Sequence, residues 1–311
     1  MRLRPRLLAA LLALALLPGG AAVASPVDEK LDVLVFTETT GFRHDSIIDG
    51  IKYFNRLAAD TGLEGVDVDV ELAENSTGWF TDDTLKRFDV VVFLSTTGNP
   101  LNTTEQGAFE RFIQRGGGYL GVHAAADSEY SWPWYGDLVG GYFSSHPAGT
   151  PQATINVEDG DHASTAHLPS RWTRSDEWYN YRRNPRKQVC NTAPEVAGVE
   201  TQSVLEPMPG LPFPLSLAQP SDTGIPEEYD TREQDCTVHV LLSLDESTYN
   251  NNNPMGDHPI AWCHNFDGGR GFYTGLGHTS ASYSDPAFSK HLLGGLLTAA
   301  GLADCPGPEQ P

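Results

Sequence analysis

Short runs of apolar, often β-branched residues constrain the fold of this chain more than any other feature of its sequence. Residues 31–36 (LDVLVF) and 90–94 (VVVFL) show no polar face, which is typical of strands buried on both sides in a parallel sheet. Residues 66–72 (VDVDVEL) alternate apolar residues with acids, and they predict a strand with one wetter face near an edge of the sheet.

Helical patterns lie between these strands. Residues 46–61 form the first, and its apolar face consists of Ile47, Ile48, Ile51, Phe54 and Leu57. Residues 103–115 form the second, which Asn102 and Glu105 introduce as a capping arrangement. The alternation continues through Val122 and predicts an α/β fold, in which ligands bind at the carboxyl ends of the strands.

The second half of the chain is less regular. Its candidate strands are residues 154–157, 172–179, 238–244, 259–266 and 271–274, and a helix at 286–300 closes the fold. The stretch between Cys190 and Cys236 is rich in Pro, Gly and Glu and has little periodicity. We therefore expect one domain at residues 25–304 with a surface insertion at about 188–236, followed by a tail at 305–311.

The first residues predict export. Three arginines precede an apolar run at residues 7–17, and the small residues 22–24 (AVA) form a cleavage site, so the mature chain is expected to start at Ser25. No cysteine follows the run as a lipid attachment point, and no later stretch approaches the ~20 apolar residues that span a bilayer. The sequence thus predicts a secreted protein with a Sec-type signal peptide at residues 1–24.

The charge of the chain restricts its partners. Removing the signal peptide takes away three of the 20 basic residues and leaves 41 acidic ones, a formal charge of −24 with histidine neutral. Such a surface repels nucleic acid and anionic lipid, whereas neutral ligands such as sugars remain compatible with it. The oligomeric state stays open.

Four cysteines in an exported chain favour two disulfides over metal binding, because none has a CxxC spacing. Three pairings are possible. Sequence order favours Cys190 with Cys236, and Cys263 with Cys305.

The segment GGGYLGVHAAAD, residues 116–127, reads as a strand that runs into a turn of small residues. A nucleophile elbow presents Ser or Cys at this point, but here the residue is His123. Ser128, five residues further on, is a weak substitute. Histidine can act there as general acid, general base or metal ligand.

Four other segments place polar groups beside aromatics or after strands. Arg43 and His44 follow the first strand, and His146, Glu177 and His278 occur in FSSHP, SDEWYNY and TGLGHTSASY. Histidines spaced with a carboxylate suit Zn or a similar divalent ion, although no tight signature such as HExxH is present.

Structural interpretations compete with these. His44 can cap the following helix, His146 can fix a turn before Pro147, and Glu177 can pair with Arg182 or Arg183. The remaining histidines are assigned no function: His162, His167 and His258 are expected to be exposed, and His239, His264 and His291 to occupy strand or helix surfaces.

Trp132, Trp134 and Tyr135 form an aromatic segment soon after His123. Core filling is the usual fate of such side chains, but aromatics in a loop at a strand end also make stacking platforms for sugar rings. The sequence leaves both interpretations open.

Several of these motifs together resemble the ThuA-like, or trehalose-utilisation, family. They are GFRH (41–44), GGGYLGVHAAAD (116–127), WPWYGDLVGGYFSSHP (132–147), DEWYNY (176–181), LDESTY (244–249), DHPIAWCH (257–264) and GRGFYTGLGHTSASYSDPAF (269–288). The resemblance implies a flavodoxin-like three-layer α/β sandwich with a mainly parallel sheet, similar to class I glutamine amidotransferases. It does not imply amidotransferase activity, because His123 stands where those enzymes carry the catalytic Cys.

The resemblance also implies a function in the catabolism of trehalose and related disaccharides, through 3-keto sugars. Its motifs map onto a site cluster of His44, His123, His146, Glu177 and His278. The chain departs from the family pattern between residues 186 and 238, where the cysteine-bounded insertion replaces a short connection.

Three functional hypotheses follow. The first is an enzyme that hydrolyses, eliminates or isomerises a keto-disaccharide or glycoside, since a keto group acidifies the neighbouring C–H bond. In it, His123 and Glu177 transfer protons, and His44, His146 and His278 bind a divalent metal such as Zn or the sugar hydroxyls. The residues expected to bind substrate are Arg43, Trp132, Trp134 and Tyr179. The alternatives are a non-catalytic carbohydrate-binding or accessory module, and an amidase or peptidase that uses Ser128.

Overall fold

A computed structural model describes residues 29–59, 66–187 and 237–307 of the chain. The strands are β1 (Glu29–Phe36), β2 (Val66–Ala73), β3 (Val90–Leu94), β4 (Gly118–Val122), β5 (Phe143–Ser145), β6 (Gln152–Val157), β7 (Arg171–Ser175), β8 (Asn180–Tyr181), β9 (His239–Asp245), β10 (Pro259–Phe266) and β11 (Gly269–Thr274). The α-helices are α1 (Ile47–Ala59), α2 (Asp82–Leu85), α3 (Thr103–Gln114), α4 (Pro133–Val139) and α5 (Pro286–Ala300).

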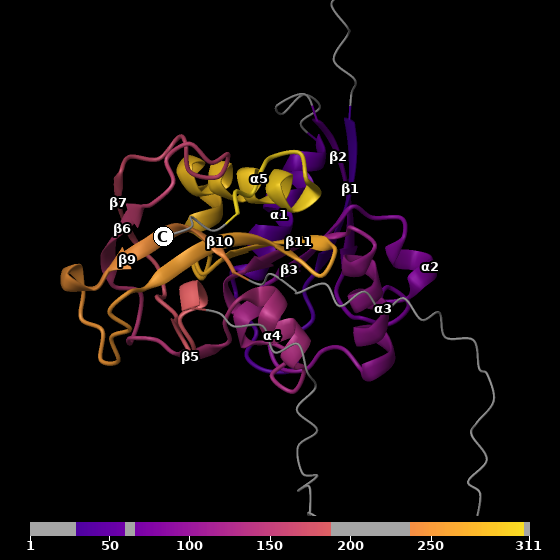
Figure 1. Cartoon of the computed structure of the whole chain (residues 1–311), viewed down its shortest axis with the longest axis horizontal. Coiled ribbons are helices and arrows are strands. Elements are labelled where there is room, and N and C mark those ends of the chain that lie inside the picture. Colours follow the sequence, from indigo (N-terminus) through magenta and orange to yellow (C-terminus); the bar gives the residue numbers. More distant parts are fainter. Residues whose placement is uncertain (1–28, 60–65, 188–236, 308–311) are drawn as a thin grey trace, which may run out of the picture.

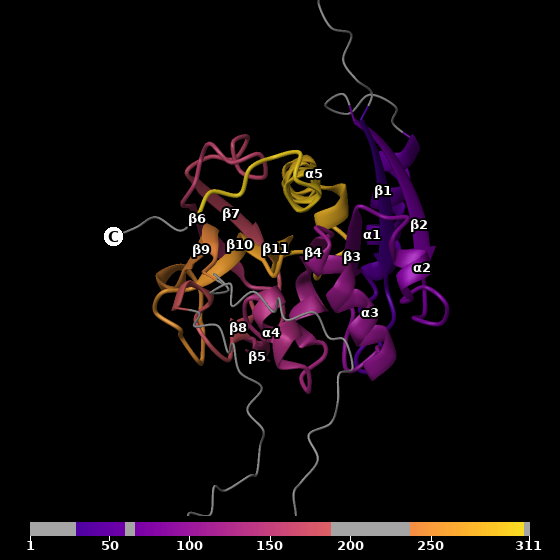
Figure 2. The ribbon, with the colours of Figure 1, turned by 45° about the vertical axis from the view of Figure 1, so that its right-hand side comes forward.

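Among these residues the main sheet has nine strands in the order β2-β1-β3-β4-β11-β10-β9-β6-β7. The first five strands of this order are parallel neighbours, and β10, β9, β6 and β7 extend the sheet by antiparallel pairing. Helices α1 and α5 lie on one face of the sheet and α3 and α4 on the other (Figures 1 and 2). The predicted three-layer α/β sandwich is therefore confirmed, with β2 at the predicted edge.

The core forms where the strands are apolar on both faces. All five residues of β3 and of β4 are buried, as expected for central strands between two helix layers. Helix α3 starts with the predicted capping box, in which Asn102 accepts from the backbone N–H of Glu105 and Glu105 accepts from that of Asn102. In α1, however, Ile48 is 60% exposed, so it does not belong to the buried face on which the sequence placed it.

The predicted strand at residues 172–179 was too long. Strand β7 ends at Ser175, because the next residue, Asp176, turns its carboxylate inward to accept backbone N–H groups of the segment after β11. The short strand β8 follows and pairs with β5 in a separate two-stranded sheet. The aromatic segment at 132–135 is not a loop either, since Pro133 begins helix α4 in the first helical position, where a missing N–H is tolerated.

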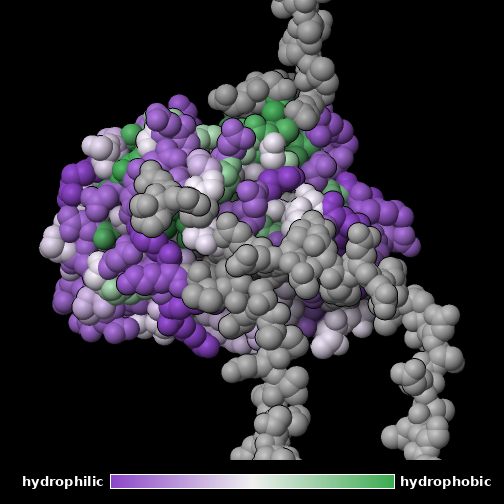
Figure 3. All heavy atoms as spheres, viewed as in Figure 1, coloured by the Kyte–Doolittle hydropathy of each residue, from purple (hydrophilic) through white to green (hydrophobic). Residues whose placement is uncertain are grey.

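One of the two expected disulfides is present: Cys263 in β10 bonds to Cys305 and ties the chain after α5 to the sheet. The other pair, the signal peptide and the insertion at 188–236 lie outside the described residues. In the part of the chain that the structure describes, no helix has both the length and the apolar character needed to cross a membrane. The surface seen in Figure 3 is mostly hydrophilic, in keeping with the charge of the chain.

Candidate functional site

The turn after β4 presents His123 in a strained conformation. Its backbone φ is 49°, in the left-handed region that few residues other than glycine adopt, and its side chain is fully buried. Strand β11 fixes this turn in two ways: the Tyr273 hydroxyl donates to the carbonyl of His123 at 2.8 Å, and His123 Nδ1 lies 2.9 Å from the Gly275 carbonyl. Because a carbonyl can only accept, Nδ1 carries the proton, and in the neutral ring Nε2 has a free lone pair.

This lone pair faces two other side chains. His123 Nε2 lies 3.2 Å from His278 Nδ1 and 3.3 Å from Glu177 Oε2. His278 Nδ1 is in turn 3.2 Å from the same carboxylate oxygen, so three ligand-type atoms converge on one point.

His44 completes the group. Its ring stands edge-on to the rings of His123 and His278, with centroid distances of 4.9 and 5.1 Å. Ligand atoms of His44, His123, Glu177 and His278 all lie within 4.8 Å of one another. The four residues come from segments after β1, β4, β7 and β11, and they meet at the sheet edge where the sequence predicted a ligand site.

Asp176 holds one side of this arrangement. Its buried carboxylate accepts from the backbone N–H groups of Gly277 and His278, at 3.0 and 3.1 Å, and Arg174 lies beside it as a counter-charge. Gly277 has a φ of 109°, so the turn that delivers His278 requires a glycine there. The sequence prediction assigned Asp176 no role, although its place directly before Glu177 was the available signal.

Electrostatics keep the carboxylate of the group ionised. Burial alone raises the pKa of Glu177, but hydrogen bonds and charge interactions with His123 and His278 outweigh it and leave that pKa well below its usual range. The hydrogen bond to Glu177 raises the pKa of His278. For His44 the opposite holds, because burial and then the neighbouring histidines lower its pKa to about 3.

The residue types of the group are ones that bind cations. Three imidazoles and one carboxylate are common ligands of Zn²⁺ and similar ions. The bond from His123 Nδ1 to a backbone carbonyl is the outer-shell contact that orients metal-bound histidines. His44 Nδ1 is buried with no hydrogen-bond partner among the described residues, which is unfavourable unless another group satisfies it.

The other predicted site residues lie at different distances from this group. His146 Nδ1 is 3.2 Å from Glu177 Oε1, yet its side chain is 37% exposed and it is not one of the four converging residues. The Tyr179 ring is buried against His123, with ring centroids 4.3 Å apart. Arg43 is exposed and donates to the Thr37 carbonyl.

The two tryptophans lie elsewhere. Trp132 and Trp134 stack on each other and pack against Phe109, and the Trp134 indole donates to Asp267 in the β10–β11 turn. That turn precedes β11, whereas the histidine group follows β11 and β4, so the tryptophans extend toward the opposite end of the sheet. They fill the layer around α4, and the structure does not bring them to the site.

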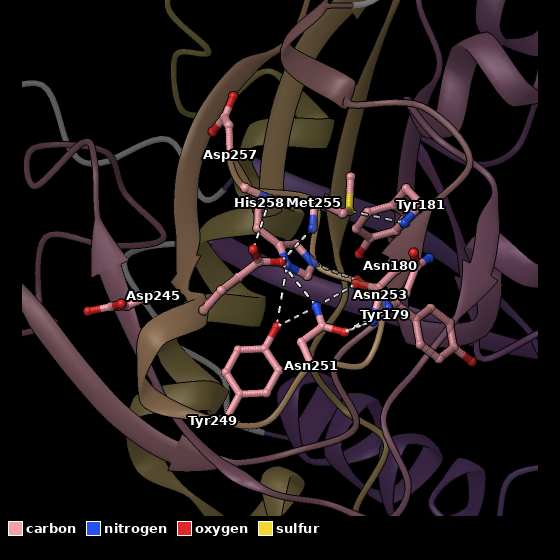
Figure 4. A network of polar contacts seen from close by, with 12 residues as sticks. Tyr179, Asn180, Tyr181, Asp245, Tyr249, Asn251, Asn253, Met255, Asp257 and His258 are labelled. Carbon is pink, nitrogen blue, oxygen red and sulfur yellow. Dashed lines mark hydrogen bonds and ion pairs between the residues drawn. The ribbon is translucent and has the colours of Figure 1, made fainter.

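A network of polar contacts supports the Tyr179 side of the site (Figure 4). Glu246 accepts from the backbone N–H groups of Met255 and Gly256 and contacts His258, which donates from Nε2 to the Tyr179 carbonyl at 2.8 Å. The Tyr179 ring points away from this network (Figure 4). It packs against the ring of His123, which the figure does not label.

The competing structural interpretations of the site residues are wrong for two of them. Glu177 does not pair with Arg182 or Arg183, because Arg183 bonds to Asp137 and Arg182 lies over the ring of Tyr130. The His44 side chain does not cap α1.

The histidines that were given no function are more buried than the sequence suggested. His162, His258, His264 and His291 are all 5% exposed or less, against the prediction of loop or surface positions. Each uses ring nitrogens to bond the interior; His291, for example, contacts the Ser164 carbonyl and the Thr274 hydroxyl. Ser128 is buried beside Thr96, and no histidine bonds to it among the described contacts.

Comparison with known proteins identifies the family. The family model described as ThuA, trehalose utilisation, matches residues 32–220 and 217–299, so the chain belongs to this family. Two solved structures share the fold over nearly their whole length. A ThuA-like protein from Bacteroides uniformis is 20% identical, with a TM-score of 0.58 over 91% of this chain and 95% of that chain. One from Parabacteroides merdae is 17% identical, with a TM-score of 0.58 over 90% and 94%. No curated protein matches the sequence significantly.

Proposed function

We propose that this protein is a secreted enzyme of saccharide catabolism that works with a divalent cation bound by His44, His123, Glu177 and His278. The observation that carries the proposal is the convergence of four ligand-type side chains from four separate segments within 4.8 Å. Membership of a family described by trehalose utilisation supports a saccharide as the substrate, and the acidic charge of the chain favours a neutral ligand over an anionic one.

The bound cation would supply positive charge to a carbonyl or hydroxyl oxygen of the substrate. His146 is suited to proton transfer, because its ring is partly exposed beside the cluster while its Nδ1 faces Glu177 and the Pro147 carbonyl. Three roles differ from those expected from the sequence. His123 and Glu177 become ligands instead of proton-transfer groups, since the His123 ring is buried with its Nδ1 held by a carbonyl and Glu177 is one of the four converging residues. His146 becomes the acid or base instead of a ligand.

The substrate class that fits is a keto-disaccharide or glycoside. A keto group makes the adjacent C–H bond acidic, so the reaction needs a base at that carbon and positive charge at the oxygen. His146 would act as the base, and the cation held by His44, His123, Glu177 and His278 would supply the positive charge beside it.

Turnover of 3-keto-trehalose by the full secreted chain tests the proposal. We expect activity that a chelator removes and added Zn²⁺ or Mn²⁺ restores. Glu177→Gln should lower kcat/KM by roughly 100-fold or more, because loss of outer-shell partners alone costs ~10–100-fold at metal sites. His239→Asn is the matched control, since His239 bonds to Asp159 instead of the cluster. Full activity of Glu177→Gln, or of the chelated protein, would refute the proposal.

A further inference from the structure

An exposed aromatic ring borders the histidine cluster. Among the described residues, Phe42 and Ile48 are the exposed large hydrophobic side chains, and Phe42 is 68% exposed. A single exposed apolar side chain is common on proteins. Phe42 differs from Ile48 because it lines a hollow whose other walls include the cluster residues His44 and His278.

The backbone around Phe42 is held in place. Thr97, a buried residue after β3, donates from its hydroxyl to the Phe42 carbonyl at 2.8 Å and accepts from the Gly41 N–H at 3.2 Å. The Thr40 N–H bonds to the Thr97 carbonyl as well. The Phe42 ring also meets the His44 ring edge-on, with centroids 4.9 Å apart. The Phe42 side chain is thus exposed on a segment whose backbone is held by hydrogen bonds, next to the histidine cluster.

The hollow combines one apolar wall with polar ones. Besides the aromatic residue, its lining includes the hydroxyl-bearing residues Thr150, Thr279 and Ser280 and the acidic residue Asp45. A pyranose ring has matching character, with an apolar C–H face that stacks on aromatic rings and hydroxyls around its rim that bond to polar side chains.

We infer that Phe42 is a stacking platform for a pyranose ring of the substrate, at the entrance to the histidine cluster. The choice of a saccharide as the ligand rests on the proposed function, whereas the position of the platform rests on the hollow and on the anchored Phe42. Phe42 thus takes the place of Trp132 and Trp134, for which the sequence had suggested the aromatic contact.

Calorimetric titration of the full chain with trehalose tests the platform. Phe42→Ala should weaken trehalose binding about tenfold, the upper end of what aromatic contacts contribute. Phe42→Trp should bind within about twofold of the wild type because it keeps an aromatic face, and so should the matched control Ile48→Ala. Thermal unfolding of all three should be unchanged, since both native side chains are exposed.

Two results would overturn the inference: unchanged affinity in Phe42→Ala, or no binding of trehalose by the wild type. Failure of the proposed function is a separate outcome. If Phe42→Ala loses affinity while the wild type turns over no keto-sugar, the platform stands and the assigned chemistry is wrong.

Discussion

Histidines in two regions of this molecule are used in opposite ways. Beneath α5 and along β10, the rings of His162, His264 and His291 direct nitrogens at hydroxyl groups and backbone carbonyls. At the carboxyl ends of β4 and β11, nitrogens of His123 and His278 face each other and one carboxylate.

The difference shows what separates a structural histidine from a candidate ligand. A buried ring whose nitrogens meet backbone and hydroxyl partners is satisfied as it stands. Ring nitrogens that face each other and a carboxylate need an N–H hydrogen, such as one on His278 Nδ1, or a metal ion between them, because lone pairs and carboxylate oxygens only accept. Burial does not distinguish the two groups, because His123 and His291 are both fully buried.

Replacing one histidine in each region gives the largest contrast. His278→Ala removes a proposed ligand, so we expect kcat/KM for 3-keto-trehalose to fall by on the order of 100-fold with the free energy of unfolding changed by less than about 1 kcal/mol. His264→Ala should lower the free energy of unfolding and keep its activity per folded molecule. Steady-state kinetics and urea unfolding of both variants measure these two quantities. Equal losses of activity in the two variants would contradict the distinction between the regions.

His291→Ala should be the more destabilising of the structural changes. The ring is fully buried and bonds to Ser164 and Thr274, so its removal leaves a cavity and takes a hydrogen bond from both the Ser164 carbonyl and the Thr274 hydroxyl. We expect the free energy of unfolding to fall by about 3 kcal/mol, measured in urea. A loss below about 1 kcal/mol would mean that the interior rearranges around the site.

The same residue predicts how stability depends on pH. Burial, followed by nearby charges on His167, Arg174 and His162, lowers the pKa of His291 to about 3, although the Ser164 carbonyl opposes the shift. As the pH falls below about 6.5, this histidine takes up a proton in the unfolded chain but stays neutral in the folded chain. Its contribution to the free energy of unfolding is therefore fully present above about pH 6.5 and is lost as the pH falls toward about 3.

At pH 5 this single group should reduce the free energy of unfolding by about 2 kcal/mol relative to pH 7. His291→Gln should show a smaller decrease than the wild type between these pH values. Comparison within the pair isolates His291 from His278, whose raised pKa acts in the opposite direction. Identical decreases in the two proteins would contradict the assignment.

Glu246→Gln should have the smallest effect. The amide oxygen still accepts a hydrogen bond, but the charge opposite His258 is lost, and His258 holds the Tyr179 carbonyl. We expect about 1–2 kcal/mol less unfolding free energy and a lower kcat with KM little changed. An unaltered kcat would show that the Tyr179 ring does not depend on this network.

The sequence predicted the first half of the fold well because its signals there are local. Strand β3 lacks a polar face, and Asn102 with Glu105 caps α3 through contacts three residues apart. The end of β7 escaped prediction because Asp176 leaves the strand to bond backbone groups about a hundred residues away. No local pattern records such a partner.

The same limit applies to the site. His123 and His278 were found because each follows a strand, and strand ends meet at one edge of the sheet. The burial of His258 and His291 was missed because their partners, Glu246 and Ser164, are known only from the tertiary structure. Likewise, the sequence does not indicate at which end of the sheet a tryptophan lies. Trp134 follows the turn of His123 in the chain, yet its indole bonds to Asp267 in the β10–β11 turn.

Elemental analysis of the purified full chain tests the central claim most directly. We expect one divalent ion per chain in the wild type and in His264→Ala, and loss of that ion in both His278→Ala and Glu177→Gln. A wild type that binds no ion after dialysis against Zn²⁺ or Mn²⁺, or cluster variants that retain it, would contradict the account.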